Sequence, residues 1–325
     1  MPIARIALCV LLLVPFAGFC ADTVRVGYVT GVDPAKAAIV DAGFDRPGLH
    51  FDWRRFDNGA EVVRALAAGD VDIANIGSSV VAVAASRQLP LETFLIGSQL
   101  GGSEALVARN GSGIKSPADL PGRTIAVPFV TTAHYSLLAA LKHWGIDQNR
   151  VRIVNLRISE IPAAWAGGNI DAAYAFDPAL GRIKESGTVL TTSIEVGAWG
   201  APTFDVWIAR TAFSSGHPDA VRAFVVTALA LIDAYRRDPA AFAADAGKVD
   251  RLVRATGAKA ADIPGLLAGN GYPNAAEQRS LLSGGYVRAL ADTATFLKNQ
   301  GKVDTILPSY QAYATTRFLP DAGAR

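Results

Sequence analysis

The chain has 325 residues, of which half are hydrophobic and 18% are charged, a composition typical of globular proteins and not of disordered or repetitive ones. Lys and Arg exceed Asp and Glu only slightly, 31 against 29, and no basic run occurs. This near balance argues against nucleic acid or an anionic surface as the partner and favours a small molecule. At this length, two lobes with separate cores are expected.

The first residues have the pattern of an export signal. Arg5 precedes an apolar run, residues 6–14, and small residues then lead to Asp22. The run is too short to span a bilayer, and the later apolar stretch at residues 221–235 is interrupted by charge. The sequence therefore predicts that residues 1–21 are a signal peptide and that the mature chain is exported.

Both cysteines, Cys9 and Cys20, lie within this segment, so the mature chain is predicted to lack an internal disulfide. A lipid anchor on Cys20 is the alternative to simple cleavage, but the bulky Phe19 stands where a lipoprotein signal has a small residue. The stability of the mature chain is therefore expected to come from two hydrophobic cores.

Strands and helices are predicted to alternate in the first part of the mature chain. Residues 23–29 alternate apolar and polar side chains, which predicts a strand, and Asp33-Pro34 predicts a helix start. The next expected elements are a strand at 51–56, a helix at 61–68, a short buried strand at 71–75 and a helix at 80–87. This spacing is typical of parallel α/β layering.

The same order begins again downstream. A Gly-rich turn near Asn110 precedes a helix start at Ser116-Pro117. The elements expected after it are a strand at 124–127, a helix at 131–144, a strand at 151–156, a helix at 159–166 and a strand at 170–176. We therefore expect two α/β lobes, each a mostly parallel sheet flanked by helices.

Two similar strands are expected to cross between the lobes. Glu104–Arg109 and Asp205–Arg210 each place a carboxylate five residues before an Arg on an alternating apolar stretch. Helices expected at 219–237 and 286–300 then complete the first lobe. The predicted boundaries are residues 22–106 and 206–325 for the first lobe and residues 107–205 for the second.

A short motif occurs twice in the chain. Residues 66–75 align with residues 165–174, and the first copy continues into Gly77-Ser78-Ser79 whereas the second continues into Asp177. Ligands of open α/β sheets bind at the carboxyl ends of the strands. Both tails are therefore expected to face a cleft between the lobes.

Two helix starts in these regions carry hydroxyl groups. Ser78 and Ser79 precede the helix at 80–87, and Thr131 and Thr132, with His134 close behind, begin the helix at 131–144. Free backbone N–H groups and the helix dipole make such positions suited to an anion. The alternatives are that the hydroxyls only cap their own helices and that His134 is a surface or supporting residue.

Three carboxylates are candidates for binding a ligand cation. Glu104 and Asp205 are polar residues at the ends of otherwise apolar strands, where a solvated edge or a pair with Arg is the alternative. Asp177 precedes a Pro, so helix capping is its alternative role. Tyr28 and Trp199 lie beside Gly-bearing turns and are candidates for an aromatic wall against an ammonium group.

Catalytic and cofactor motifs are missing from the sequence. It contains no P-loop, no Rossmann glycine fingerprint, no His-Glu-x-x-His and no Gly-x-Ser-x-Gly. The histidines show no metal-ligand spacing, and no thiol remains after signal cleavage. We expect no enzymatic activity, metal or cofactor; a hydrolase that uses Ser78 or His134 is the alternative from another class.

Taken together, these residues resemble the periplasmic solute-binding proteins of ABC-type importers, in the group that binds taurine and alkanesulfonates. The resemblance covers nearly the whole mature chain, and its specific segments are residues 52–57, 63–67, 77–79, 102–106, 132–145 and 199–207. It implies a two-lobed type II fold with two crossover strands, a periplasmic location and a monomer that delivers its ligand to a permease with its ATPase.

The resemblance also implies roles for the candidate site residues, because members of this group hold a small aminosulfonate between the lobes. Those implied to bind the sulfonate are Ser78, Ser79, Thr131, Thr132 and His134. Those implied to bind the ammonium are Glu104 and Asp205, with Asp177 as a third carboxylate. Plain alkanesulfonates or another small zwitterion are the alternative ligands, and a soluble sensor subunit is an alternative role for the same cleft.

The chain departs from this group at three places. Residues 29–31 read Val-Thr-Gly where a Gln is expected, Val80 replaces a Pro, and Asp177 replaces a small apolar residue. The changes at residues 29–31 and at Asp177 are expected to alter the size or the polar groups of the ligand. They therefore bear on taurine itself more than on the class of aminosulfonates.

Overall fold

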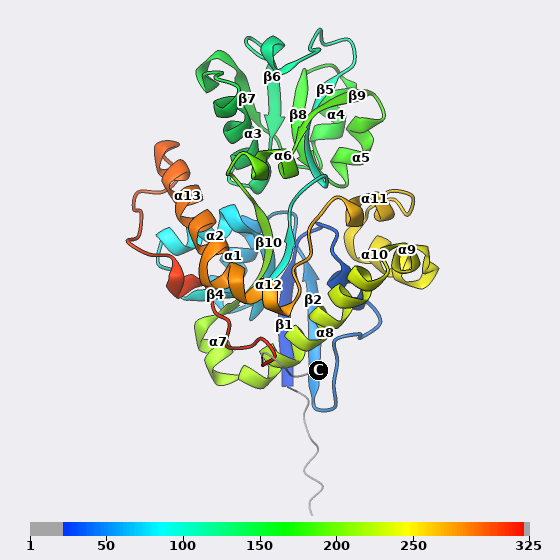
Figure 1. Ribbon diagram of the computed structural model, residues 1–325, viewed down its shortest axis with the longest axis vertical. Coiled ribbons are helices and arrows are strands. Elements are labelled where there is room, and N and C mark those ends of the chain that lie inside the picture. Colours follow the sequence, from blue (N-terminus) through cyan, green and yellow to red (C-terminus); the bar gives the residue numbers. More distant parts are fainter. Residues whose placement is uncertain (1–21, 322–325) are drawn as a thin grey trace, which may run out of the picture.

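The computed structural model describes residues 22–321, which form two lobes, each built on a five-stranded sheet covered by helices (Figure 1). The predicted signal peptide, residues 1–21, lies outside the described residues. The first sheet has the strand order β2-β1-β3-β10-β4, and the second has the order β7-β6-β8-β5-β9. The two orders correspond position by position, so the lobes repeat one topology.

The first sheet consists of β1 (Asp22–Tyr28), β2 (Leu49–Arg55), β3 (Ile73–Gly77), β4 (Leu91–Gln99) and β10 (Phe204–Arg210). The second consists of β5 (Glu104–Arg109), β6 (Thr124–Val127), β7 (Arg152–Asn155), β8 (Ala172–Phe176) and β9 (Gly187–Thr192). Helices of the second lobe are α3 (Thr132–His143), α4 (Ile161–Ala166), α5 (Ala179–Lys184) and α6 (Ser193–Ala198). Those of the first lobe are α1 (Gly59–Ala68), α2 (Ser78–Ser86), α7 (Thr211–Gly216), α8 (Pro218–Arg237), α9 (Pro239–Ala244), α10 (Ala246–Thr256), α11 (Ile263–Ala268), α12 (Ala275–Ser280) and α13 (Tyr286–Asn299). Among residues 22–321, no helix is both long enough and apolar enough to cross a membrane.

The expected alternation of strands and helices is confirmed, and most predicted elements lie within two residues of the observed ones. The two helices expected to start at Pro34 and Pro117 are different: both are short 3₁₀ segments, η1 (Pro34–Ala38) and η2 (Pro117–Asp119). Each ends early because the chain soon turns through a positive φ, at Asp41 in the first case and at Gly122 in the second.

Each sheet is mostly parallel, as predicted, with one antiparallel member in the fourth position. β10 runs antiparallel to β3 and β4, and β5 runs antiparallel to β8 and β9. The two stretches that were expected to cross between the lobes are β5 and β10. Each of these strands belongs wholly to one sheet, so neither crosses. The chain crosses just before them, at residues 100–103 and 199–203, so boundaries after residues 106 and 205 fall inside β5 and β10.

The duplicated motif has a structural role that is the same in both lobes. Asp72 accepts a hydrogen bond from a β1 backbone N–H at 3.1 Å and pairs with Arg210 at the end of β10. Asp171 accepts one from a β6 N–H at 2.9 Å and lies 4.0 Å from Arg109 at the end of β5. The carboxylate of each copy therefore joins a parallel strand to the antiparallel strand and fixes its position in the sheet.

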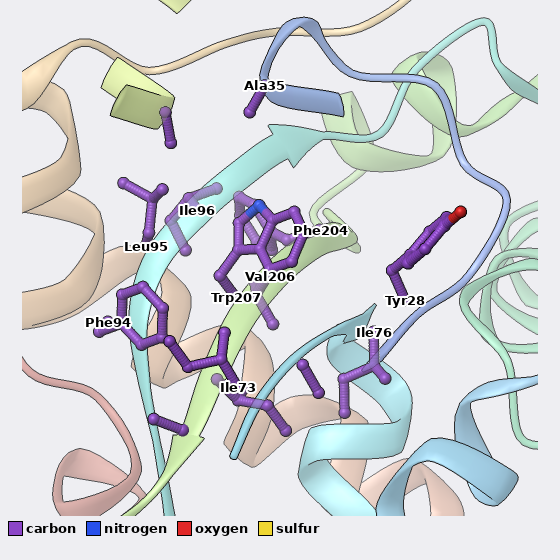
Figure 2. Close-up of a cluster of buried hydrophobic side chains, with 14 of the residues drawn as sticks. Tyr28, Ala35, Ile73, Ile76, Phe94, Leu95, Ile96, Phe204, Val206 and Trp207 are labelled. Atoms are coloured by element: carbon purple, nitrogen blue, oxygen red, sulfur yellow. The ribbon is translucent and has the colours of Figure 1, made fainter. Parts of the chain in front are cut away.

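The core of the first lobe lies around β10. Figure 2 shows Phe204, Val206 and Trp207 of this strand among buried side chains of β3 and β4. Trp207 is fully buried, and its ring centroid lies 4.8 Å from that of Phe224 on α8. Burying a side chain of this size stabilises the fold by roughly 1.5–3 kcal/mol. β10 is thereby held rigidly, and so is the start of the strand, where Asp205 lies.

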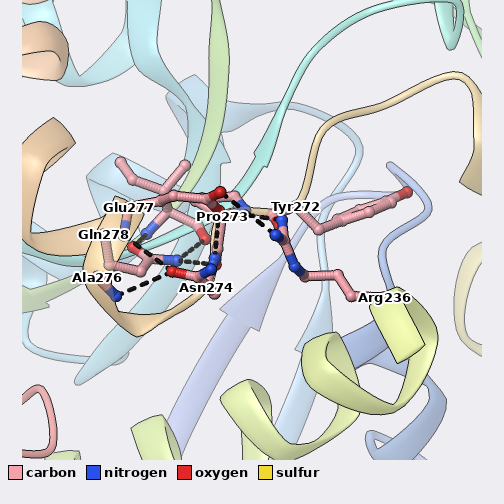
Figure 3. Close-up of polar contacts among 8 residues, drawn as sticks. Arg236, Tyr272, Pro273, Asn274, Ala276, Glu277 and Gln278 are labelled. Atoms are coloured by element: carbon pink, nitrogen blue, oxygen red, sulfur yellow. Dashed lines mark hydrogen bonds and ion pairs between the residues drawn. The ribbon is translucent and has the colours of Figure 1, made fainter.

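The segment after α11 is fastened to the first lobe and reaches the crossover. Gln278 on α12 exchanges two hydrogen bonds with the backbone of Ile96, at 2.8 and 2.7 Å. Figure 3 shows this segment, where Arg236 of α8 also contacts the Tyr272 carbonyl. Asn270, in the same segment, accepts hydrogen bonds from the Gly101 N–H at 2.9 Å and the Ser103 hydroxyl at 2.6 Å. The first crossover is therefore anchored to the first lobe.

Candidate ligand-binding cavity between the lobes

A cavity of about 490 Å³ lies between the two lobes, at the carboxyl ends of their parallel strands. From the first lobe it is lined by residues 29–32 after β1, by Arg55 at the end of β2, by residues 57–60 around the start of α1, and by Gly77 and Asp205. From the second lobe it is lined by Glu104 and by the segments that follow β6, β7 and β8. The cleft that the duplicated motif predicts is therefore present, and its walls come from both lobes.

Glu104 lies at the start of β5 and is buried within a group of hydroxyls. Its Oε1 accepts a hydrogen bond from the Thr132 hydroxyl, and its Oε2 accepts one from Ser193 at 3.0 Å. The Ser193 oxygen also lies 3.0 Å from the Tyr174 hydroxyl and 3.3 Å from that of Ser136. Burial raises the pKa of Glu104 to about 7, although the hydrogen bond from Thr132 lowers it. This carboxyl group is therefore poised between its neutral and ionised forms near neutral pH.

Asp205 lies at the start of β10, 9% exposed, and faces the same cavity. Burial raises its pKa, and the nearby charge of Lys36 partly offsets this. A Cβ at Gly31 would lie 2.5 Å from Asp205 Oδ2 and 3.7 Å from Lys36 Nζ, so the carboxylate, the lysine and the Gly31 backbone are packed together. Among the described residues, no hydrogen bond or ion pair engages the Asp205 carboxylate.

Lys36 is fully buried in η1 and holds the loop that follows β1. Its ammonium donates hydrogen bonds to the carbonyls of Val29, at 3.0 Å, and Gly31. It also lies 3.6 Å from Asp33 Oδ2, in an ion pair that is itself almost completely buried. A buried ammonium is stable only when charges and hydrogen bonds compensate its lost hydration. Lys36 therefore fixes the cavity-lining loop at residues 29–31 and places a positive charge behind Asp205.

The start of α3 reaches the cavity from the second lobe. Thr131 caps the helix, because its side chain accepts a hydrogen bond from the His134 N–H at 3.2 Å, and its hydroxyl donates to the Pro128 carbonyl at 2.6 Å. Both Thr131 and Thr132 line the cavity. A Cβ at Gly77, just before α2, would lie 3.0 Å from the Thr132 methyl group. The N-terminal ends of α2 and α3 therefore approach each other across the cleft.

Three residues predicted on the sulfonate side lie away from the cavity surface. The Ser78 hydroxyl accepts a hydrogen bond from the Phe204 N–H at 3.2 Å, and the Ser79 hydroxyl is buried with no hydrogen-bond partner among the described residues. His134 stacks on Phe129 with ring centroids 4.5 Å apart. Burial lowers its pKa to about 4, so its imidazole is neutral near neutral pH. None of the three lines the cavity, so a hydrolase that uses Ser78 or His134 gains no support.

The predicted aromatic wall is not observed. Tyr28 is 7% exposed, and its ring packs edge-on against Trp53 at 6.1 Å. Trp199 lies outside the cavity and stacks on His143 with ring centroids 3.9 Å apart. It is the residue directly after α6, and its partner His143 is the last residue of α3. The aromatic rings that line the cavity within the described chain are instead those of Phe129 and Phe176.

Asp177 lies on the cavity lining and also binds the helix that follows it. Its Oδ1 accepts a hydrogen bond from the Gly181 N–H at 2.9 Å, and its carbonyl accepts one from the Thr30 hydroxyl of the first lobe at 3.4 Å. Burial raises its pKa, and Gly181 partly offsets this. The N-cap of α5 is Pro178, one residue later than the capping alternative expects, although Asp177 does accept a hydrogen bond from the first turn of this helix. The residue also contributes to the contact between the lobes.

Several residues of this site were not predicted from the sequence. Lys36 and Ser193 lie behind the two carboxylates, whereas Arg55, Arg157 and Asn270 are on the lining. Arg55 is the last residue of β2 and Arg157 follows β7, so the rule that ligands meet strand ends could have pointed to them. No sequence signal separates the buried Lys36 from a surface lysine.

The described residues offer no metal site, because no three His, Cys, Asp or Glu side chains among residues 22–321 lie close enough together to hold an ion. The cavity instead combines buried carboxylates, two helix N-termini and two guanidinium groups. Such a set suits a small ligand that carries both a positive and a negative charge.

Comparisons with known proteins agree with this geometry. The family model described as NMT1/THI5 like matches residues 38–241. The taurine-binding periplasmic protein of Escherichia coli (strain K12) is 48% identical over 92% of this chain and 93% of its own. The solved alkanesulfonate-binding protein SsuA from Xanthomonas axonopodis pv. citri, bound to MOPS, covers 89% of this chain and 97% of its own, with a TM-score of 0.73 at 19% identity. The aliphatic sulphonate binding protein SsuA from Escherichia coli covers 91% and 99%, with a TM-score of 0.71 at 18% identity. The last two likenesses show a common fold, and the family match together with the 48% identity shows that this chain belongs to the NMT1/THI5-like family, as a relative of a periplasmic taurine-binding protein.

Proposed function

We propose that this chain is the periplasmic solute-binding component of an ABC-type importer and that its two lobes close on taurine or a close aminosulfonate. The observation that carries the proposal is the meeting of Glu104 and Asp205 in one cavity, from opposite lobes and without an Arg or Lys ion pair among the described residues. Within the described chain, Glu104 is compensated only by hydroxyls, and Asp205 only by the nearby charge of Lys36, with which it forms no ion pair. A ligand ammonium between the two carboxylates would compensate both.

The ammonium of the ligand has three N–H donors, which suits two carboxylates that approach it from different sides. Glu104 is the group that changes state, because its raised pKa of about 7 leaves it partly protonated in the empty cavity at neutral pH. A bound cation favours the ionised form and lowers this pKa. Binding of the ammonium is therefore expected to release a proton from part of the molecules.

The sulfonate is assigned to the facing N-termini of α2 and α3. The first turn of each helix has backbone N–H groups without helical partners, and Thr131 and Thr132 add hydroxyls at the cavity surface. Each helix end contributes roughly 0.3–1 kcal/mol when exposed and up to about 2 kcal/mol when partly buried. Ser78 and His134 are left with a supporting role because their side chains contact Phe204 and Phe129. Ser79 is left with a supporting role because its buried hydroxyl lies off the cavity lining.

Ligand binding would stabilise the closed form because the ligand groups bridge the lobes. α2 and Asp205 belong to the first lobe, whereas α3 and Glu104 belong to the second. A ligand that contacts both sets binds the closed form better than the open form, which is what shifts such an equilibrium. The closed monomer would then deliver its ligand to a membrane permease with its ATPase, with no reaction catalysed.

Isothermal titration of the mature protein with a small ligand panel tests this proposal. Taurine is expected to bind at least about tenfold more tightly than isethionate, which replaces the ammonium by a hydroxyl, or than ethanesulfonate, which removes it. A micromolar dissociation constant for taurine corresponds to about 8 kcal/mol. Equal affinity for ethanesulfonate and taurine would mean that the protein is a binder of plain alkanesulfonates and that the two carboxylates have another role.

A further inference from the structure

Of the described residues, two with aromatic rings line the cavity, and one of these rings is engaged by other side chains. Phe129 stacks on His134 with ring centroids 4.5 Å apart, and Lys302 Nζ lies over the same Phe129 ring, 5.4 Å from its centroid. Phe176 is only partly buried, and its ring forms no aromatic stack and no cation contact with any side chain of residues 22–321. Phe176 therefore keeps a ring surface that a ligand can contact.

Phe176 lies directly beside Glu104. The two residues are antiparallel partners at the end of β8 and the start of β5, so their side chains leave the same face of the sheet with Cβ atoms about 4.5–5.5 Å apart. Neighbouring contacts agree with this placement. Tyr174, two residues before Phe176, reaches the Ser193 oxygen that also donates to Glu104, and Phe176 packs on the core cluster that contains Tyr174. The ring and the carboxylate are therefore adjacent parts of one wall of the cavity.

In the first lobe the corresponding partner of Asp205 is Gly77, which has no side chain. A Cβ at Gly77 would lie 3.9 Å from Asp205 Oδ1 and 3.6 Å from the Thr132 hydroxyl oxygen. The same Thr132 hydroxyl donates a hydrogen bond to Glu104. The two carboxylates therefore approach each other around position 77, where the glycine leaves space between them. Of the two lining rings, Phe176 is the one that is a direct strand neighbour of either carboxylate.

We propose that Phe176 forms a third side of the ammonium site and that the cavity therefore also accepts an aminosulfonate with one methyl group on its nitrogen. This inference rests on the proposed function, because it keeps the ammonium between Glu104 and Asp205. Two N–H groups of the ammonium bind the two carboxylates, and the remaining position on the nitrogen faces the ring. An aromatic face attracts a cation within about 6 Å of the ring centroid, and it recognises methylated ammonium groups in the same way.

The specificity follows from what surrounds the nitrogen. One methyl group replaces only the hydrogen that faces the ring, so both contacts with the carboxylates remain. Three methyl groups keep the charge but leave no N–H donor for either carboxylate. The cavity volume of about 490 Å³ lies within the roughly 300–1,000 Å³ of pockets for drug-sized ligands, so it has room for a methyl group beside taurine. The site is therefore expected to bind taurine and N-methyltaurine similarly and to reject N,N,N-trimethyltaurine.

Isothermal titration of the wild type, Phe176→Leu and Phe129→Leu with taurine, isethionate and the two methylated ligands tests the inference. Leucine keeps an apolar side chain at position 176 but removes the ring, so the preference for taurine over isethionate is expected to shrink by about 3- to 30-fold. Phe129→Leu removes the other lining ring and is expected to change the affinity for both ligands by the same factor. In the wild type, which needs no variant to fold, N-methyltaurine is expected to bind within about fivefold of taurine. N,N,N-trimethyltaurine is expected to bind at least about 30-fold more weakly.

The outcomes separate the inference from the proposed function. A wild type that prefers taurine over isethionate, with the same preference in Phe176→Leu, overturns the inference and leaves the proposed function intact. A larger loss than expected for N-methyltaurine in the wild type also overturns it, because polar groups would then surround the nitrogen on every side. A preference that shrinks equally in Phe176→Leu and Phe129→Leu overturns it as well, since the cause would be the shape of the cavity. A wild type that does not distinguish taurine from isethionate contradicts the ammonium site itself, and the inference then fails together with the proposed function.

Discussion

Glu104 and Asp205 occupy corresponding positions in the two lobes, yet the protein holds them in different ways. Glu104 is paired with Phe176 at the end of β8, and Asp205 is paired with Gly77 at the end of β3. Around Glu104 the compensating groups are neutral hydroxyls, from Thr132 and Ser193. The repeated topology therefore places one carboxylate from each lobe at the cavity, but the side chains that surround the two carboxylates differ.

Behind Asp205 the compensating group is a buried cation. Lys36 fixes the loop at residues 29–31 and its charge opposes the rise in pKa that burial causes for Asp205. Hydroxyls can serve either form of a carboxyl group, whereas a lysine favours only the ionised form. We therefore expect the two carboxylates to respond differently to mutation and to pH. The surroundings of Asp205 should be the more rigid, and the protonation of Glu104 should be the more sensitive to pH.

The largest expected effect is on stability, from Lys36→Met. The change leaves the Asp33 carboxylate buried without its cation and releases the loop at residues 29–31, so the free energy of unfolding should fall by about 3–5 kcal/mol. Urea denaturation followed by circular dichroism measures it. The exposed Lys298 provides the control, since Lys298→Met should change stability by about 0.5 kcal/mol or less. Equal losses of stability in Lys36→Met and Lys298→Met would contradict the role of Lys36 as the group that stabilises the loop behind Asp205.

Next in size is a loss of affinity from Gly31→Ala. The new Cβ would stand 2.5 Å from Asp205 Oδ2, and the movable carboxylate must turn away from its place in the cavity. Taurine affinity should fall about 10- to 100-fold, the effect of losing a charged hydrogen bond, while stability changes little. Titration calorimetry and thermal unfolding measure the two quantities. Gly216→Ala is a suitable control, because a Cβ there meets nothing within 4 Å; unchanged affinity in Gly31→Ala would argue against the role of Asp205.

The pH dependence should report on the second lobe. Burial raises the pKa of Glu104 from 4.5 to about 7, so the folded protein binds more protons here than the unfolded chain between these values. The contribution of Glu104 to stability is therefore most favourable below the unfolded pKa and declines as pH rises toward about 7. Taurine needs the ionised form, so its affinity should fall by up to about tenfold per pH unit below the folded pKa.

Titrations of taurine between about pH 5 and about pH 8 measure this dependence, with Glu104→Gln as the partner variant. Glu104→Gln should bind taurine more weakly at neutral pH but with an affinity that no longer changes through this range. If the pH dependence of taurine affinity persists unchanged in Glu104→Gln, another residue titrates. That result would contradict the claim that the carboxylate of the second lobe is the one that responds to pH.

The smallest expected effect comes from Ser193→Ala, which removes one hydroxyl donor from Glu104. Because that hydrogen bond lowers the pKa of Glu104, its loss should move the pH midpoint of taurine binding upward. Affinity at neutral pH should fall several-fold, consistent with about 1 kcal/mol for one hydrogen bond. The exposed Ser215 gives a matched control, Ser215→Ala. A midpoint that stays in place, with affinity reduced equally at every pH, would make Ser193 a purely structural residue.

The fold could be predicted from the sequence because local patterns determine it. Alternating strands and helices, the repeated Asp72 and Asp171, and the echo of Glu104 and Asp205 all indicate two lobes of one topology. The exact place of the crossovers could not be predicted, since β5 and β10 look like independent strands in the sequence and only their pairing shows which sheet each one joins.

The site could be predicted only where the backbone alone determines the position of a residue. Glu104, Asp205 and Thr132 reach the cavity because they start a strand or a helix at the cleft. Ser78 also starts a helix, but its hydroxyl binds the Phe204 N–H of the neighbouring strand, a contact that depends on tertiary packing. The stacking of Trp199 on His143 also depends on tertiary packing, so the sequence could not predict it.

The measurement that tests the central claim most directly is the titration of taurine and isethionate into the wild type and Asp205→Asn. The amide keeps the shape of Asp205 but removes the charge that we assign to the ligand ammonium. Taurine should lose about 10- to 100-fold in affinity, while isethionate, which has no ammonium, should change little. Equal losses for the two ligands would contradict the account, because Asp205 would then not distinguish an ammonium from a hydroxyl.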